Sequence, residues 1–380
     1  MPEHAGIVRF DRNEVSGAFG DLGTSFPLIV GMIAAARLDA TSVLVAFGLL
    51  QVLTGLVYRM PMPVQPLKAV AAIVIAQHIS SNVLFGGGAA IGFLMLFLAL
   101  SGLLDWLARV VPHVVVRGIQ FGLGIQLTRI AVAEYVPSGG ASGYVLAAVA
   151  FSIVLLLLGN RRLPPAPIVL VLGAVFALTI GGAGASAFAA IGVHAPVLFV
   201  PTGNDLWQGF ILLAIPQIPL SLGNSVLATK RVAADLFPDR EPLRIRTIGM
   251  TYAGMNIVSA FIGGVPVCHG SGGMAGHYTF GARTGGSVII AGVGLLTIGV
   301  LFGGSFGEVA LFFPKPMLGV LLLFEGVAMM VLLRDLTSDM RNFGLALLLG
   351  VVAAGLPYGY LVALVLGTVI AKTKLNVTVA

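Results

Sequence analysis

Two segments marked by prolines hold polar residues within an otherwise apolar chain. One covers residues 60–69 and contains Gln65 and Lys68, and the other covers residues 264–273 and contains His269. In each segment the prolines favour an extended start, and the small residues that follow favour a helix. Each segment therefore predicts a half-helix that begins inside the apolar interior.

A helix that begins inside a membrane suits a bound anion. Its first N–H groups are free and its dipole is positive at that end, so two such ends that face each other form an anion site. Glycine at position 270 lets the main chain approach a ligand closely, and Lys68 and His269 add positive charge. We expect the substrate to contact Thr24, Ser25, Gln65, Lys68, Gln217, Cys268, His269, Gly270, Ser271 and Gly272.

Three ionisable residues in these apolar segments have more than one interpretation. An ionisable group within a membrane span is costly and usually functional. Lys68 either faces the anion or belongs to a structural ion pair, for which Asp21 is the obvious partner. Asp21 could instead carry a coupling proton, and Glu325 has either a local structural role or a role in proton relay. We therefore expect proton coupling to use Asp21 or Glu325.

The neighbours Cys268 and His269 raise the hypothesis of a thiol nucleophile with its base. Consecutive residues of a helix point about 100° apart, so these two cannot form a dyad by themselves. His269 keeps two interpretations, which are contact with substrate or proton handling, and packing at the start of a helix. We expect the protein not to be an enzyme, and we expect no cofactor and no metal.

The composition sets the class of protein in which these residues work. Of 380 residues, 58% are hydrophobic and 9% are charged, against about 25% charged in an average soluble domain. Such a chain cannot cover its surface with charge, which excludes a soluble globular fold and a disordered chain. The single cysteine excludes an internal disulfide framework and a cysteine-based metal site. The net charge of +6 does not indicate a nucleic-acid partner, because in a membrane protein the place of each charge matters more than the sum.

Long apolar runs predict an all-α membrane protein, with about fourteen transmembrane segments in one membrane domain over residues 1–380. Segments 3 and 10 are the two half-helices, and their hydropathy alone supports them poorly. The expected segments cover residues 18–36, 41–58, 64–79, 83–104, 110–132, 144–159, 166–192, 208–229, 247–262, 267–280, 286–303, 316–333, 341–356 and 358–371.

The basic residues give the orientation of these segments. With both termini inside, sixteen Lys and Arg residues fall on the cytoplasmic side, and Arg37 and Lys315 fall on the other side. Omitting segment 10 would move Arg334 and Arg341 outside. We therefore expect a multi-pass protein of the cell (plasma) membrane with both termini in the cytoplasm. The first fourteen residues lack the features of a signal peptide.

The irregular stretches recur at corresponding places in the two halves. Segments 3 and 10 form one pair, and residues 23–28 in segment 1 and 216–221 in segment 8 form another. An odd number of segments in each half gives the halves opposite orientations. We therefore expect two inverted seven-segment repeats, over residues 14–192 and 205–375, with the substrate between broken helices near the midplane.

These same stretches resemble the molybdate transporter family, a branch related to the sulfate permease (SulP) superfamily. The resemblance extends from about Val15 to the C-terminus, and it rests most on Pro-Met-Pro-Val-Gln-Pro at 61–66 and Cys-His-Gly at 268–270. It implies a core domain of segments 1–4 and 8–11 and a gate domain of segments 5–7 and 12–14.

We expect no STAS domain of the kind common in sulfate permeases, so dimerisation through it cannot be assumed. Ser271 departs from the alanine of the family pattern and adds a hydroxyl. Further matching stretches are 20–24, 67–68, 216–220, 223–226, 266–267, 271–273, 278 and 280–285.

Together these features predict a secondary active transporter that imports a tetrahedral oxyanion, with molybdate as the favoured substrate. Importing a dianion against an inside-negative potential costs about 4.6 kcal/mol per 100 mV, so accumulation needs coupling, and proton symport is the simplest form. The alternatives are a transporter of sulfate or another anion, and an uncoupled anion channel. The expected partners are the oxyanion, protons and the lipid bilayer, and a homodimer remains an open alternative.

Overall fold

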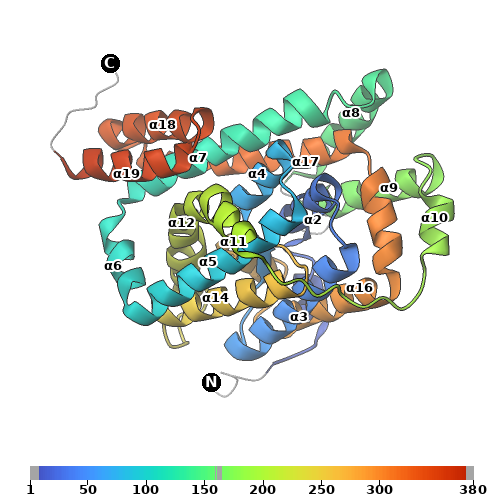
Figure 1. The fold of residues 1–380 in the computed structure, drawn as a ribbon, viewed down its shortest axis with the longest axis horizontal. Coiled ribbons are helices and arrows are strands. Elements are labelled where there is room, and N and C mark those ends of the chain that lie inside the picture. The colour runs from blue at the N-terminus through green and yellow to red at the C-terminus, as the bar shows by residue number, and fades with distance from the viewer. Residues whose placement is uncertain (1–7, 159, 161–164, 374–380) are drawn as a thin grey trace.

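The computed structural model describes residues 8–158, 160 and 165–373, without the side chains of residues 22–24, 76 and 108. This part of the chain is a bundle of helices around two three-residue strands (Figure 1). Helices dominate because apolar segments in lipid must satisfy their own backbone hydrogen bonds.

A helix lies at each of the fourteen expected segments. The elements of the first half are α1 (Arg12–Gly17), α2 (Leu22–Ala36), α3 (Ala40–Tyr58), β1 (Val64–Pro66), α4 (Lys68–Gln77), α5 (Ser81–Ser101), α6 (Leu103–Val110), α7 (His113–Arg129), the π-helix η1 (Ile130–Tyr135), α8 (Gly140–Leu157), α9 (Pro165–Thr179) and α10 (Gly184–Ala189). The elements of the second half are α11 (Gly203–Gly209), the π-helix η2 (Phe210–Ala214), α12 (Ile215–Leu220), the π-helix η3 (Ser221–Ala228), α13 (Thr229–Leu236), α14 (Ile245–Phe261), β2 (Val267–His269), α15 (Ser271–Thr279), α16 (Gly286–Phe312), α17 (Lys315–Val331), the 3-10 helix η4 (Leu332–Leu336), α18 (Met340–Gly355) and α19 (Gly359–Lys372).

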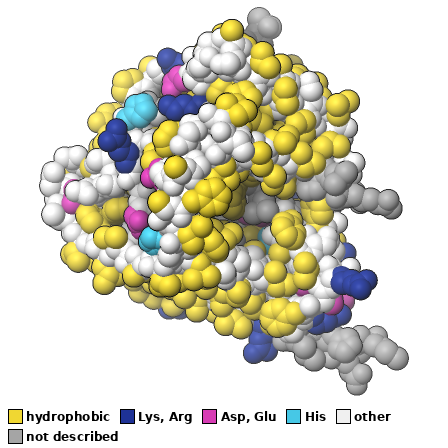
Figure 2. Space-filling view, turned by 90° about the vertical axis from the view of Figure 1, so that its right-hand side faces the viewer, with side chains coloured by type: hydrophobic (Ala, Val, Ile, Leu, Met, Phe, Trp, Pro, Cys, Tyr) yellow, Lys and Arg dark blue, Asp and Glu magenta, His cyan; other side chains and the backbone are white. Residues whose placement is uncertain are grey.

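The surface of this bundle suits a membrane. Within the described residues, six helices are long and apolar enough to cross a bilayer by length and composition, and four shorter helices are also apolar. Figure 2 shows one face on which hydrophobic side chains are abundant, with most Lys and Arg side chains toward the edges of the view. The protein is therefore a multi-pass membrane protein.

The helices pack in two groups. In the first group α3 lies along α16, and α5 lies along α11 and α14; in the second, α7 lies along α17 and α18, and α19 packs on α18. Figure 1 shows α7, α17, α18 and α19 on one side of the molecule and α3, α5, α14 and α16 on the other. Facing glycines allow the close approach of α3 and α16, since a Cβ on Gly48 would lie 2.7 Å from the carbonyl oxygen of Gly292.

Segments 3 and 10 both consist of an extended stretch followed by a short helix. β1 pairs antiparallel with β2, and Gln65 lies opposite Cys268 in the register. The backbone N–H of Leu67 extends the pairing by donating to the carbonyl of Pro266 over 3.0 Å. Because the strands run in opposite directions, α4 and α15 leave the pair from opposite ends, and both helices begin in the interior of the bundle.

Two buried amide side chains satisfy the outer edges of the strands. Gln51 of α3 donates to the carbonyl of Val64 over 3.3 Å and accepts from its N–H over 3.0 Å. Asn256 of α14 donates to the carbonyl of Val267 over 2.7 Å and accepts from its N–H over 2.9 Å. Each amide comes from the helix that precedes the strand, so the same device occurs once in each half of the chain.

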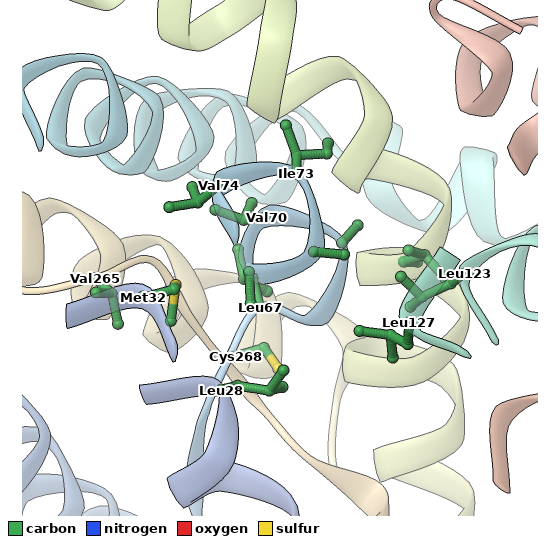
Figure 3. Close-up of a cluster of buried hydrophobic side chains, with 14 of the residues drawn as sticks. Leu28, Met32, Leu67, Val70, Ile73, Val74, Leu123, Leu127, Val265 and Cys268 are labelled. Atoms are coloured by element: carbon green, nitrogen blue, oxygen red, sulfur yellow. The ribbon is translucent and has the colours of Figure 1, made fainter. Parts of the chain in front are cut away.

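The helix α4 lies within the main hydrophobic core. Figure 3 shows side chains of α4 between those of α2 and those of α7. Packing on both sides fixes where α4 begins, and it keeps lipid away from the end of the helix. The labelled residues are Leu67, Val70, Ile73 and Val74 at α4, Leu28 and Met32 of α2, Leu123 and Leu127 of α7, and Val265 and Cys268 at β2.

The expected pair of irregular stretches in segments 1 and 8 is only half present. Residues 23–28 lie in the continuous helix α2, with Pro27 inside it, so the expectation of a broken helix there is wrong. A single proline removes one helical hydrogen bond, and the surrounding helix continues past it. In segment 8, Pro216 and Pro219 lie between the wider π-helical turns of η2 and η3, so this stretch is irregular as predicted.

Candidate functional site

A cavity of about 160 Å³ lies beside the paired strands, where α4 and α15 begin. It is lined by eight of the ten residues expected to contact substrate, and these come from five elements, β1, α4, α12, β2 and α15, and from Gly270 between β2 and α15. Five further residues complete the lining. The expected residues at the cavity are Gln65, Lys68, Gln217, Cys268, His269, Gly270, Ser271 and Gly272, and the additional ones are Leu220, Asn224, Ser225, Met329 and Leu332.

The N-termini of the two half-helices lie at this cavity. Among the described residues, no side chain caps α4, which begins after Leu67, or α15, which begins after Gly270. The first N–H groups of a helix have no partner within the helix, and the helix dipole is positive there. Two N-termini at one cavity therefore supply hydrogen-bond donors and positive potential for an anion.

Gln65 is held in place by a carboxylate next to the cavity. Its Nε2 donates to Oδ1 of Asp21, and the hydroxyl of Ser25 donates to Oδ2 of the same aspartate over 2.8 Å. Gly270 provides the room for this amide, because a Cβ at that position would overlap with the Gln65 side chain. Gln65 lies in β1 and Lys68 begins α4, and both residues line the cavity.

Asp21 and Ser25 line a different, larger cavity of about 290 Å³ that is mainly apolar. The structure therefore does not bring Ser25 to the cavity that holds the other expected residues. Thr24 belongs to α2, but its side chain lies outside the described part of the chain.

Lys68 forms its ion pair with Glu325 of α17, and not with Asp21 as expected. The physical reason is the packing, because α17 brings a carboxylate to the first turn of α4 while Asp21 is engaged by Gln65 and Ser25. The side chain of Lys68 is 21% exposed and that of Glu325 is 10% exposed, so the pair lies at the wall of the cavity. It also links α4 to α17, a helix of the second packing group.

Gln217 brings a buried amide to the wall of the cavity. Its Nε2 donates to the hydroxyl of Ser221 over 3.3 Å, and that hydroxyl shares a hydrogen bond of 2.6 Å with the Tyr252 hydroxyl. Within the described part of the chain its Oε1 has no hydrogen-bond partner, and the residue is 3% exposed. A buried amide oxygen without a partner is unfavourable.

His269 lies at the cavity, but its ring is engaged in packing. Nε2 shares a hydrogen bond of 2.8 Å with the hydroxyl of Thr251, and the ring packs edge to face on Tyr58 with 5.3 Å between centroids. The hydrogen bond to Thr251 occupies one ring nitrogen of His269. Within the described residues, no group of three or more His, Cys, Asp or Glu is arranged to hold a metal ion.

Asn224 and Ser225 line the cavity but were not among the residues expected there. These residues lie seven and eight positions after Gln217, which is two helical turns, so the spacing alone was a signal for a shared face. Asn224 of η3 also accepts a hydrogen bond from Gln120 of α7, a helix of the second packing group. No comparable sequence signal pointed to Met329 and Leu332, whose apolar side chains look like ordinary core residues.

Comparison with known proteins identifies the family. Residues 13–127 and 209–329 match the family model described as "Molybdate transporter of MFS superfamily". Molybdate transporter 2 of Arabidopsis thaliana is 33% identical, covering 87% of this chain and 81% of that protein. Molybdate transporter 1 of Chlamydomonas reinhardtii is 27% identical, covering 93% of this chain and 90% of that protein.

Two solved structures are similar in fold. The transmembrane domain of a cyanobacterium bicarbonate transporter, BicA, has a TM-score of 0.66 at 18% identity, covering 90% of this chain and 97% of that domain. The murine Solute Carrier 26 family member A9 anion transporter, in the inward-facing state, has a TM-score of 0.72 at 14% identity, covering 96% of this chain and 69% of that chain. At these identities the similarity shows the fold alone. The family match over more than half of the chain, together with the identity to the Arabidopsis protein, shows that this protein belongs to the molybdate transporter family.

Proposed function

We propose that the protein is a secondary active transporter that imports molybdate, bound in the cavity between the N-termini of α4 and α15. The observation that carries this proposal is the cavity itself, which combines two uncapped helix N-termini with Lys68 and the amides of Gln65 and Gln217. A volume of about 160 Å³ has room for a few water molecules or for one small oxyanion. The names of the relatives, which are molybdate transporters, favour molybdate among such anions.

The amide of Gln217 is suited to an anion in this cavity. Turned by 180° about its last bond, it would present its NH₂ group to the cavity and accept from the hydroxyl of Ser221. Its oxygen would then have a partner, and the anion would gain a donor. An oxyanion therefore explains why this amide lies buried at the cavity with an atom unpaired.

We also propose fourteen segments in two inverted repeats, in a plasma membrane protein whose termini both lie in the cytoplasm. The paired strands and the matching amides Gln51 and Asn256, one in each half, support the two repeats. In this arrangement the core domain holds both half-helices, and the gate domain contains α7 and α17. Movement of the core against the gate would expose the cavity to each side in turn.

Proton symport would supply the energy for accumulation. Asp21 and Glu325 are the acids near the cavity, since Asp21 binds Gln65 and Glu325 binds Lys68. Each proton that enters with a dianion cancels one unit of its charge, so it lowers the cost that the membrane potential sets on import.

Uptake into proteoliposomes that contain only this protein tests the proposal. With an inward proton gradient, we expect molybdate to accumulate above its external concentration, and we expect an uncoupler to abolish the accumulation. The Lys68→Ala variant, reconstituted at equal density, is the control for transport through this cavity. Flux that only follows the electrochemical gradient would indicate a channel, and accumulation of sulfate in preference to molybdate would indicate another anion as substrate.

A further inference from the structure

Lys68, which is the cation of the proposed anion site, is paired with Glu325 in this structure. Lys68 lies in the first turn of α4 and lines the cavity, and its ammonium group is paired with Oε1 of Glu325. Met329 and Leu332 also line the cavity, and they follow Glu325 by four and seven positions. Spacings of four and seven place all three residues on one face of α17 and η4. Glu325 therefore comes from the face that closes the cavity.

An oxyanion in this cavity competes with Glu325 for the same ammonium group. The anion carries two negative charges, and an ionised carboxylate next to it would be repelled. Glu325 would also be a largely buried carboxylate without its cation, which again disfavours the charged form. Uptake of a proton removes both penalties, and Lys68 stays an ammonium because it now faces the anion.

We propose that Glu325 is the coupling residue of this site: it neutralises Lys68 while the cavity is empty, and it takes up one proton from water when the oxyanion pairs with Lys68. This inference rests on the proposed function. The new O–H bond forms on Glu325, the proton comes from solvent, and the ion pair between α4 and α17 is lost. Loss of this pair also removes a side-chain link between α4 and the second packing group.

Asp21 is less suited than Glu325 to couple the uptake of a proton to the binding of the anion. Its carboxylate is held by the neutral donors of Gln65 and Ser25, and it lines the apolar cavity instead of the cavity with the helix N-termini. Asp21 lies near Lys68 but is not its ion-pair partner, so an anion that pairs with Lys68 leaves Asp21 with its hydrogen bonds from Gln65 and Ser25.

Other charges near Glu325 do not replace Lys68. The elements packed against α17 are α2, α7, η1, α8, α9 and η4, and of these α2 and α9 carry no Asp, Glu, Lys, Arg or His. On the others, His113 and Arg117 contact Asp335, and Arg129 and Glu134 are exposed. The titratable residues on these elements are His113, Arg117, Arg129, Glu134, Tyr135, Tyr144, Arg334 and Asp335, and those beside Lys68 are Asp21, Cys268 and His269.

Calorimetry of molybdate binding to the purified protein, in buffers of different ionisation enthalpy at one neutral pH, counts the protons taken up. We expect about one proton per bound molybdate in the wild type, and an affinity that falls about tenfold per pH unit where free Glu325 is ionised. In Glu325→Gln we expect binding without proton uptake and with little dependence on pH. The matched control is Asp335→Asn, which removes a carboxylate paired with Arg117 away from the cavity and should behave like the wild type.

Binding by the wild type without proton uptake would overturn the inference, as would full proton uptake in Glu325→Gln. The wild-type proton count decides the matter even where Glu325→Gln does not fold. Failure of the wild type to bind molybdate, tungstate or sulfate would overturn the proposed function and this inference together. The two failures are therefore distinguishable.

Discussion

Gly270→Ala should damage the cavity through a single side chain, Gln65. The backbone at Gly270 has φ −104° and ψ 115°, which any residue adopts, so alanine introduces no backbone strain there. The three atoms nearest to the added Cβ all belong to Gln65, so this amide must leave its position. The displacement removes the hydrogen bond to Asp21 and one donor from the cavity. A hydrogen bond to a charged group contributes about 1.5–3 kcal/mol, so molybdate affinity should fall roughly tenfold to a hundredfold.

A double-mutant cycle separates this cause from a general effect of alanine at position 270. In Gln65→Ala, the side chain that clashes is gone, so adding Gly270→Ala should change the affinity by less than about 0.5 kcal/mol. Calorimetric titration of molybdate into the four proteins, with thermal unfolding as a check of the fold, gives the coupling energy. If Gly270→Ala weakens binding equally in both backgrounds, the steric argument is wrong.

Three further substitutions test separate parts of the structure. Gln217→Leu should weaken molybdate binding about tenfold or more, because it removes a donor to a charged ligand, and unchanged affinity in a titration would contradict the role of this amide. Glu14→Gln should lower stability by about 2 kcal/mol in thermal unfolding without changing binding, because the buried carboxylate accepts from the N–H groups of Thr284 (2.8 Å) and Ser287 (2.9 Å) at the start of α16. Equal unfolding temperatures would show that this contact adds nothing. Cys268→Ala should keep most molybdate uptake, and complete loss would revive a thiol mechanism.

Much of the fold was predictable because its signals are local. Long apolar runs gave the helices, and prolines next to small residues gave the two half-helices at β1–α4 and β2–α15. The distribution of basic residues supported segment 10, which hydropathy alone would have missed. Pro27 was misleading, because a proline inside a sequence pattern does not show whether the surrounding helix continues.

The contacts that complete the site could not be predicted in the same way. The partner of Lys68 is 257 positions away in the chain, and only the packing of α17 against the core brings Glu325 to it. Gln51 and Asn256 look like isolated polar residues in apolar helices until the edges of the strands are seen beside them. The ion pair of Lys68 with Glu325 in place of Asp21, and the position of Ser25 at another cavity, both depend on contacts across segments that the sequence does not specify.

The most direct test of the account is calorimetric binding of molybdate, tungstate and sulfate to the purified protein and to Lys68→Ala at low phosphate. We expect the wild type to bind molybdate and tungstate more tightly than sulfate. We expect Lys68→Ala to bind molybdate and tungstate much more weakly while its thermal unfolding shows a folded protein. Equal molybdate affinity in the wild type and Lys68→Ala would contradict the claim that the anion lies between α4 and α15.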